Sequence, residues 1–374
     1  MTRLSGPVVA FLLLALSSGC IPRGSTKPMV KIGLVAPFEG LYRPLGYEVL
    51  PAVKLALSER NQAGGVQGHM VELVALNDDQ DPETAAQRAS EMALDPDVVG
   101  VIGHFGEQTT VASLPIYRAA GLALVVSATT ATEVTEQGHG QTFRLVADDR
   151  VLGAAAARYA VVEQDARRVA VVGGPSEVVD SFVSMAQQMG AVVSQYPDDH
   201  QRSLLSFLAS GSHDLIFFAG DGMQGAELVA ELRKSGIDIP FMGANGLDNP
   251  HFVQVAGDAA DGAVYMSVAP PVRDQDFVEG YWALSGGLPG PHAALAYDAA
   301  TLLLDAIEMS VLEQGQPTRE GVIKALSGVE AHDGLTGPIS FDERGQALGR
   351  QVYVYEIVGG QYPGQLRECD ACAP

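Results

Sequence analysis

The run VKIGLVAP, residues 30–37, is the first of four short apolar segments that alternate with helical patterns. The other three apolar segments are Val71–Leu76 (VELVAL), Val98–Ile102 (VVGVI) and Leu122–Val126 (LALVV). Continuous apolar runs of this length are typical of strands that are buried on both faces of a parallel sheet. The segments between them predict helices over Leu45–Asn61, Pro82–Ala93, Thr109–Ala119 and Ala131–Gln137. This part of the chain is therefore expected to form βαβ units.

The same alternation restarts after a polar stretch at Ala147–Arg150 (ADDR). Helices are predicted over Val151–Glu163, Val178–Met189, Ser203–Ala209 and Gly225–Ser235. Strands are predicted over Arg168–Val172, Ala191–Gln195, Asp214–Phe218, Phe241–Gly243 and Gly262–Met266. Because two runs of one supersecondary pattern follow each other, the sequence predicts an α/β fold with two similar Rossmann-like lobes built on parallel sheets.

Later segments predict how the chain passes between the lobes. Adjacent prolines in Val268–Arg273 (VAPPVR) predict a second connection, and three helices after it are expected to pack on the first lobe. These helices are predicted over Gln275–Leu284, Ala293–Gln314 and Arg319–Leu326. Gly337–Phe341 (GPISF) and Gln351–Val358 (QVYVYEIV) then predict a β-hairpin on the second lobe, after a third connection near Gly334–Gly337. The expected first lobe is 30–146 plus 273–333, the second is 147–268 plus 337–360, and a tail follows at 361–374.

Residues 1–20 have the pattern of an export signal. Arg3 precedes an apolar run from Val8 to Leu16, and Ser17–Gly19 lead into Cys20. The run is about half of the roughly 20 apolar residues that a membrane-spanning helix needs, which favours a cleaved signal peptide. Its end, LSSGC, resembles a bacterial lipobox, so Cys20 is expected to carry lipid, with residues 21–29 as a tether. The alternative is an ordinary secretory signal in which Cys20 is incidental.

Composition narrows the classes of function. The 374 residues carry a net charge of -22, which excludes the basic footprint of a nucleic-acid-binding protein. The same charge disfavours binding of the protein surface to anionic lipid, so any membrane attachment is expected through the lipid alone. Cys369 and Cys372 stand close together at the end of the chain and predict either a local disulfide or two exposed thiols.

Polar residues gather where the predicted strands end, which is where open parallel sheets bind ligands. In the first lobe these segments are Pro37–Leu45 (PFEGLYRPL), Gly103–Thr110 (GHFGEQTT) and Ser127–Thr130 (SATT). In the second lobe they are Gly173–Glu177 (GGPSE), Gly220–Met223 (GDGM) and Gly243–Asn249 (GANGLDN). Helix N-termini and hydroxyls in the first set suit an anionic oxygen, whereas acids and amides in the second suit an ammonium or amide group. The alternative is that these residues only cap helices and form turns.

Catalytic motifs are missing from the sequence. It has no phosphate-binding loop, no HExxH, no GxSxG and no metal-spaced set of cysteines and histidines. We therefore expect no enzyme activity, no cofactor and no metal.

Seven segments resemble the type I periplasmic binding proteins, specifically the Leu/Ile/Val-binding branch that serves amino-acid and amide ABC transporters. They are Ile32–Gly40, Asn61–Gly68, Val71–Pro82, Asp95–Gly103, Phe241–Pro250, Ala294–Ala299 and Gly334–Asp342. The resemblance implies two lobes joined by three crossings, a small-molecule ligand in the cleft and an ABC permease as partner. A sensor lipoprotein of the same fold is the alternative function.

The resemblance also assigns residues to the ligand. Thr130 matches a threonine that binds the ligand's α-carboxylate, while Glu107 replaces a serine that helps to hold that group. Asn245 replaces an acid that pairs with the α-ammonium, and Asp221 lies near a tyrosine contact. The other candidates are Tyr42, Arg43, Gln108, Thr109, Ser127, Thr129, Ser176 and Glu177. These departures predict a small polar ligand with a cationic or amide group.

Overall fold

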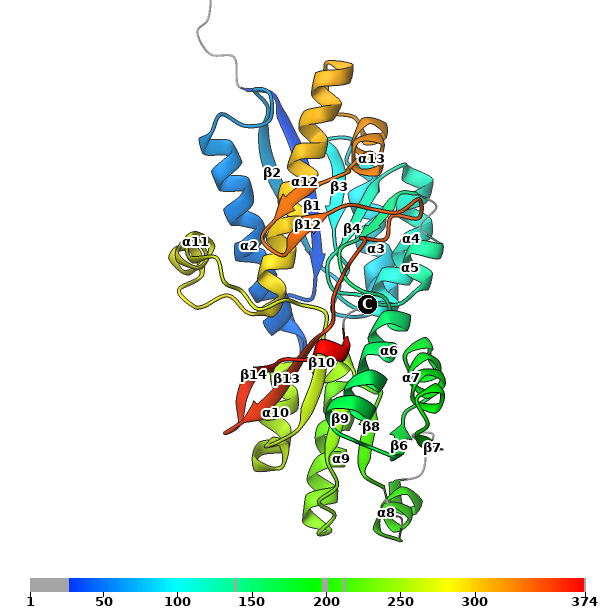
Figure 1. Ribbon diagram of the computed structural model, residues 1–374. Coiled ribbons are helices and arrows are strands. Elements are labelled where there is room, and N and C mark those ends of the chain that lie inside the picture. The colour runs from blue at the N-terminus through cyan, green and yellow to red at the C-terminus, as the bar shows by residue number, and fades with distance from the viewer. Residues whose placement is uncertain (1–26, 138–139, 197–200, 211–212, 373–374) are drawn as a thin grey trace, which may run out of the picture.

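The computed structural model describes residues 27–137, 140–196, 201–210 and 213–372, which fold into two α/β lobes joined end to end (Figure 1). The predicted signal peptide and Cys20 lie outside these ranges. None of the helices within them combines the length and the apolar character that crossing a membrane requires.

The first lobe contains a parallel sheet in the order β2-β1-β3-β4-β5. Its strands are β1 Met29–Ala36, β2 Met70–Asn77, β3 Val98–Ile102, β4 Ala123–Val126 and β5 Thr142–Arg144. The four predicted strands are confirmed. The fifth was missed because its three residues include a threonine and an arginine and form no apolar run.

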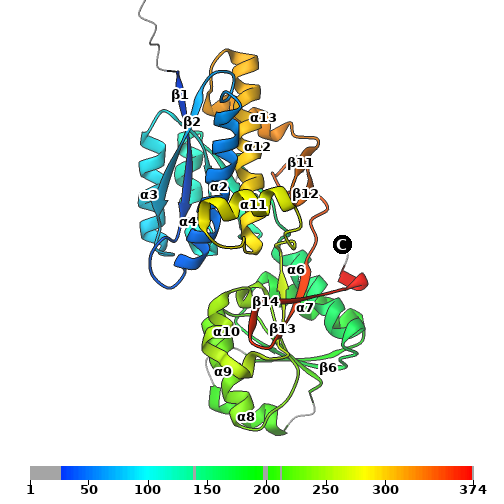
Figure 2. The ribbon, with the colours of Figure 1, turned by 90° about the vertical axis from the view of Figure 1, so that its left-hand side faces the viewer.

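Helices cover both faces of this sheet (Figure 2). One face carries α2 (Arg43–Gln62), α11 (Gln275–Ser285), α12 (Pro291–Gln314) and α13 (Arg319–Ser327), so the three late helices do return to the first lobe. The other face carries α3 (Pro82–Leu94) and α4 (Glu107–Ala120), with the short α5 (Glu133–Glu136) beside α4. Asp81 caps α3 by accepting from the Thr84 backbone N–H at 2.8 Å.

The second lobe contains a seven-stranded sheet in the order β14-β13-β10-β9-β8-β6-β7. Its strands are β6 Arg168–Val172, β7 Val192–Tyr196, β8 Leu215–Phe218, β9 Phe241–Gly243, β10 Val264–Ser267, β13 Tyr353–Val358 and β14 Gln361–Arg367. Its helices are α6 Asp149–Arg158, which continues as a π-helical turn to Glu163, α7 Glu177–Gln188, α8 Gln201–Ser210, α9 Gly222–Lys234 and α10 Pro250–Ala256.

The predicted hairpin between Gly337–Phe341 and Gln351–Val358 is wrong. Strand β12 (Gly337–Ile339) pairs with β11 (His332–Gly334), and the backbone N–H groups between them bind Asp298 of α12 in the first lobe. The segment Gly334–Gly337 is therefore a turn of the first lobe, and the third crossing comes later, before β13.

Strand β14 occupies part of the stretch predicted as a tail. It pairs with β13 through a turn at Gly359 and Gly360, whose φ angles are +60° and +66°. Tight hairpin turns favour positive φ at both central residues, so this glycine pair was a usable signal that the sequence prediction passed over. After β14, Cys369 and Cys372 form a local disulfide, and Cys372 is buried against α6.

Gly153 lets α6 and α7 approach closely, which predicts a cost for any side chain at that position. A Cβ there would stand 2.4 Å from the Val178 carbonyl oxygen and 2.9 Å from the Ser181 Cβ. We expect Gly153→Ala to lower the free energy of unfolding by about 1–3 kcal/mol, measured by urea denaturation. Gly174→Ala is the control, because a Cβ at Gly174 meets nothing within 4 Å. Equal stability of the two variants would contradict this packing argument.

Candidate ligand-binding site

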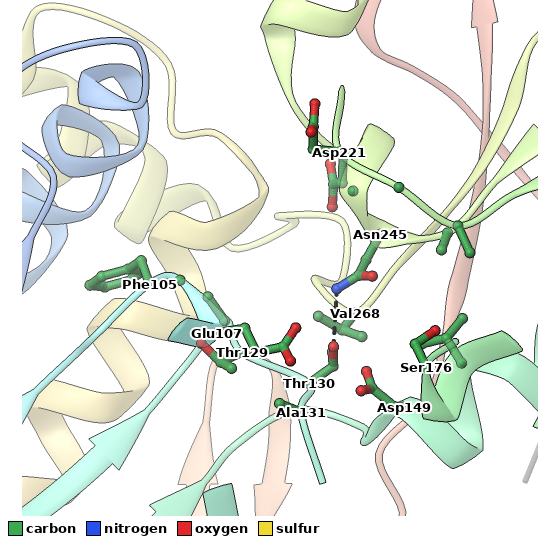
Figure 3. A pocket seen from close by; sticks show the side chains of 18 of the residues that line it. Phe105, Glu107, Thr129, Thr130, Ala131, Asp149, Ser176, Asp221, Asn245 and Val268 are labelled. Carbon is green, nitrogen blue, oxygen red and sulfur yellow. Dashed lines mark hydrogen bonds between the residues drawn. The ribbon is translucent and has the colours of Figure 1, made fainter. Parts of the chain in front are cut away.

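A cavity of about 670 Å³ lies between the lobes, where the carboxyl ends of both parallel sheets face each other (Figure 3). Both lobes supply its walls, and most of its side chains come from the loops that follow β3, β4, β6, β8 and β9. This is the position expected for a ligand of two open α/β lobes.

Eight of the twelve predicted ligand residues line this cavity. They are Tyr42, Glu107, Thr129, Thr130, Ser176, Glu177, Asp221 and Asn245. The other four lie elsewhere. Arg43 and Gln108 are exposed outside the cavity lining, whereas Thr109 and Ser127 are buried beneath it.

Helix capping accounts for part of this polar lining. Ser176 caps α7 by accepting from the Val179 N–H at 3.3 Å. Asp221 caps α9 by accepting from the N–H groups of Met223 at 2.8 Å and Gln224 at 3.0 Å. The capping interpretation therefore holds for both residues, and both also face the cavity.

A hydrogen bond spans the cavity from one lobe to the other. The Asn245 Nδ2 of the second lobe donates to the Thr130 Oγ1 of the first lobe at 3.1 Å (Figure 3). Burial raises the pKa of Asp149, and the nearby Thr130 side chain opposes that effect. The hydroxyl that the resemblance assigns to a ligand carboxylate thus accepts a hydrogen bond from an amide of the protein and lies near an acid.

A buried trio of side chains supports the floor of the cavity. The His104 Nδ1 lies 2.8 Å from the Asp78 Oδ2, and its Nε2 lies 3.0 Å from the Tyr117 hydroxyl. Asp78 and His104 are both 0% exposed. The Thr110 hydroxyl donates to the His104 carbonyl oxygen at 3.2 Å. The trio therefore holds the loop that leads to Glu107, the first residue of α4.

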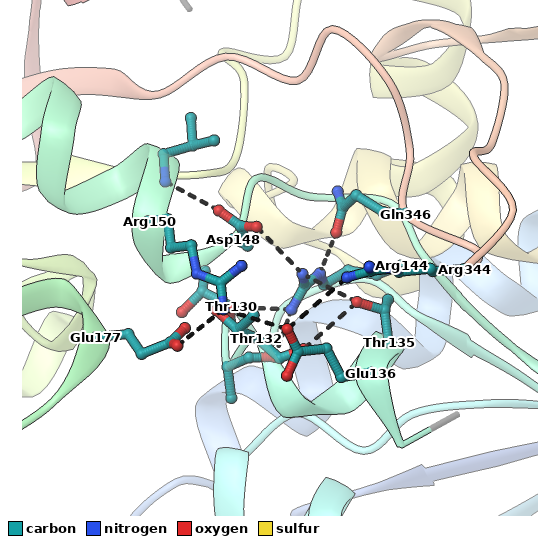
Figure 4. Close-up of polar contacts among 12 residues, drawn as sticks. Thr130, Thr132, Thr135, Glu136, Arg144, Asp148, Arg150, Glu177, Arg344 and Gln346 are labelled. Carbon is teal, nitrogen blue, oxygen red and sulfur yellow. Dashed lines mark hydrogen bonds and ion pairs between the residues drawn. The ribbon is translucent and has the colours of Figure 1, made fainter. Parts of the chain in front are cut away.

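Arg144 holds the loop beside the cavity from below (Figure 4). Its guanidinium is fully buried and donates to the carbonyl oxygens of Thr130, at 2.9 Å, and Ala131. Its Nε donates to the Gln346 Oε1 at 2.6 Å, and its Nη2 lies 3.9 Å from the Asp148 Oδ2. One side chain thus ties the Thr130 loop to the first and third crossings.

Arg150 joins the two lobes at the rim of the cavity (Figure 4). Its guanidinium pairs with Glu136 of α5 at 3.2 Å and with Glu177 of α7 at 3.0 Å. The Arg150 side chain is about half exposed, so we expect these pairs to contribute little to stability.

The family of the chain follows from a match that covers most of its length. Residues 29–361 match the family described as periplasmic binding protein. The chain belongs to the periplasmic binding protein family.

Proteins named for amino-acid or substrate binding are identical to this chain at about a quarter of the aligned residues. The leucine-, isoleucine-, valine-, threonine-, and alanine-binding protein of Pseudomonas aeruginosa is 26% identical over 341 residues, which cover 87% of this chain and 89% of the relative. A leucine binding protein from Thermotoga maritima superposes with a TM-score of 0.81 at 26% identity, covering 91% of this chain and 98% of the other. An ABC transporter substrate-binding protein from Desulfitobacterium hafniense in complex with Leu superposes with a TM-score of 0.77 at 25% identity, and the match covers 91% of this chain and 100% of the other.

The cavity between the lobes of this periplasmic binding protein is acidic. Its lining contains six carboxylates, and His292 is the one basic residue in the lining that the structure describes. The carboxylates are Glu107, Glu133, Asp149, Glu177, Asp221 and Asp248. Burial, followed by the charges of Asp149 and Glu133, raises the pKa of Glu107 above its usual value. Burial likewise raises the pKa of Asp149.

Sequence reasoning did not select several residues of this binding protein's cavity. Asp149 falls in the polar stretch 147–150 that separates the two runs of the pattern, and Asp248 lies in the loop 243–249, of which only Asn245 was predicted to bind ligand. Asp248 is held by the hydroxyls of Ser267 at 2.5 Å and Tyr362 at 2.8 Å. Because Tyr362 comes from the unpredicted strand β14, no local pattern pointed to this contact.

Proposed function

We propose that this protein is the extracytoplasmic, lipid-anchored solute-binding component of an ABC importer, and that it binds a small polar, amino-acid-like or amide ligand between its lobes. The observation that carries the proposal is the polar cavity shared by both lobes. Relatives named for amino-acid binding over nearly the whole chain support it. No bond is made or broken in this function.

Ligand binding would act by closing the cavity. A ligand that contacts Thr130 of one lobe and Asn245 of the other favours the conformation in which both contacts exist. The three connections between the lobes are the segments that would absorb such a hinge motion. The closed form would then be the one that the permease recognises.

A thermal-shift screen tests the proposed function. The panel contains amino acids, amides, urea, polyamines and small carboxylates. A ligand present at 100 times its dissociation constant should stabilise the protein by about 2.7 kcal/mol. Failure of the whole panel, together with no ligand detected by mass spectrometry of the purified protein, would contradict a solute-binding role.

The lipid anchor has a separate test. Expression of the full chain in a bacterium should place the protein in the membrane fraction, and mass spectrometry should find acyl chains on Cys20. Cys20→Ser should release it into the soluble fraction. A wild-type chain without lipid would favour the ordinary secretory signal.

Asn245→Ala should weaken binding of the ligand found in the screen. Asn245 faces the cavity from the second lobe, so its loss removes one hydrogen-bonding group from the wall opposite Thr130. We expect at least a tenfold increase in Kd, about 1.4 kcal/mol, measured by calorimetry. Gln108→Ala is the control, because Gln108 is exposed outside the cavity lining. Unchanged affinity of the Asn245 variant would remove this residue from the site.

A further inference from the structure

The charges around the cavity point to a narrower class of ligand than the proposed function does. Two of the six carboxylates, Glu107 and Glu133, stand on the first lobe. The other four, Asp149, Glu177, Asp221 and Asp248, stand on the second lobe. Both walls of the cavity are therefore acidic.

Three basic side chains at or beside the cavity already lie against acceptor groups of the protein. Arg150 is paired with Glu136 and Glu177, and Arg144 is buried under the Thr130 loop against carbonyl oxygens. His292 lies 3.9 Å from the Asp248 Oδ2. Only Glu177 and Asp248, of the six, have a basic partner within 4 Å among the described residues.

Four carboxylates thus face the cavity without an ion-pair partner in the described part of the chain. They are Glu107, Glu133, Asp149 and Asp221. Like charges that lie near each other disfavour ionisation of each other, and a cation among them removes that cost. The raised pKa of Glu107 agrees with this, because the charges of Asp149 and Glu133 contribute to it after burial.

A second observation also indicates an unfilled polar site. Thr132 lines the cavity and is only 6% exposed, and its hydroxyl, which lies near the Glu177 carboxylate, makes no direct hydrogen bond within the described residues. Buried hydroxyls are normally paired, so an unpaired one that faces a cavity marks a place for a ligand group or water.

Two aromatic residues of the cavity also suit a cationic ligand. Tyr42 and Phe105 line it from the first lobe, and ring faces attract organic cations. Burial, followed by the charge of Asp221, raises the pKa of Tyr42, so this ring and the Asp221 carboxylate lie within electrostatic reach across the cavity.

The cavity is poorly suited to the α-carboxylate of a neutral amino acid. The Thr130 hydroxyl accepts from Asn245 and lies near Asp149, and Glu107 replaces the serine expected beside it. A ligand carboxylate at this place would meet two protein carboxylates, which repel it.

We propose that the cavity selects a small organic cation with two or more positively charged nitrogen groups, of the diamine or guanidino-amine class, over neutral zwitterionic amino acids. This inference rests on the proposed solute-binding function and specifies its ligand.

Calorimetry with defined probes tests the selection. The cationic probes are 1,4-diaminobutane, spermidine and agmatine, and the zwitterionic probes are leucine, alanine and threonine. We expect at least one cationic probe to bind at least 100-fold more tightly than every zwitterionic probe. Its affinity should fall as sodium chloride rises from 50 to 500 mM, because salt screens the attraction.

Charge-neutral variants locate the effect in the cavity. Glu107→Gln and Asp149→Asn should each weaken binding of the cationic probe at least tenfold. Glu227→Gln, which removes an exposed carboxylate of α9 outside the cavity lining, should leave Kd within twofold. Equal weakening by all three variants would show a general charge effect and overturn the assignment to these residues.

The outcomes separate the two proposals. Binding of a zwitterionic probe with no binding of the cations would overturn charge selection and leave the solute-binding function standing. Binding of neither set, and of nothing else in the screen, would overturn both.

Discussion

Replacement of Arg144 by methionine is expected to lower the free energy of unfolding by about 3–5 kcal/mol, the cost of breaking a buried charged network by removing one partner. The guanidinium is 0% exposed and donates to two carbonyl oxygens and to Gln346. Methionine fills a similar volume but donates no hydrogen bond. The Thr130 and Ala131 carbonyl oxygens would then lose their shared donor, and the nearby Asp148 would lose its cationic partner. Guanidinium unfolding followed by circular dichroism measures the loss.

Arg344→Met is the matched control for this experiment. The Arg344 side chain is 66% exposed, and its closest ion-pair distance is 3.9 Å to Glu136. Its replacement should change stability by no more than about 0.5 kcal/mol. A loss of comparable size at both positions would show that general charge, and not the buried network, sets the effect.

The second large effect is expected at the buried trio beneath Glu107. Asp78→Ala should cost about 3 kcal/mol of stability, because it leaves the buried His104 ring without its carboxylate partner. It also removes the acceptor of the Gln80 backbone N–H, which lies 3.1 Å from the Asp78 Oδ1. Since the trio supports the loop before α4, ligand affinity should fall together with stability.

Two further variants distinguish the contribution of the buried trio from other causes of a loss of stability. Tyr117→Phe removes only the neutral bond to the His104 Nε2 and should cost about 1–2 kcal/mol. Asp79→Asn removes a neighbouring exposed charge and keeps a residue that tolerates the left-handed backbone, φ +53°, at that position. A cost for Asp79→Asn as large as that for Asp78→Ala would contradict the role of the buried pair.

The sheets were predictable because their central strands are continuous apolar runs. Strand β3, for example, is buried along its whole length and contacts α12 and α13 on one face and α3 on the other, so no polar position interrupts its pattern. The edges of the sheets were less predictable. Strand β5 contains Arg144, whose charge is satisfied by residues distant in sequence, including Gln346. A pattern of neighbouring residues cannot reveal a partner that is so distant in sequence.

The position of the site was predictable because the topology of the sheets determines where the strand ends meet. The carboxyl ends of parallel strands meet at one edge, so Glu107, Thr130 and Asn245 were expected near each other, and all three line the cavity. The acidic excess was not predictable in the same way. Asp149 opens a helix after a crossing, and Asp248 is fixed by a strand from the end of the chain. Their approach to the acids of the first lobe, Glu107 and Glu133, depends on how the two lobes face each other.

The way in which Arg144 holds the Thr130 loop has a consequence for how a binding protein of this family can change its ligand over evolution. The guanidinium binds carbonyl oxygens of Thr130 and Ala131, which every amino acid carries, and not their side chains. Mutation can therefore replace the side chains at these two positions while the loop keeps its anchor. Recognition of a new molecule can arise at this edge of the cavity by substitution alone, without a new scaffold.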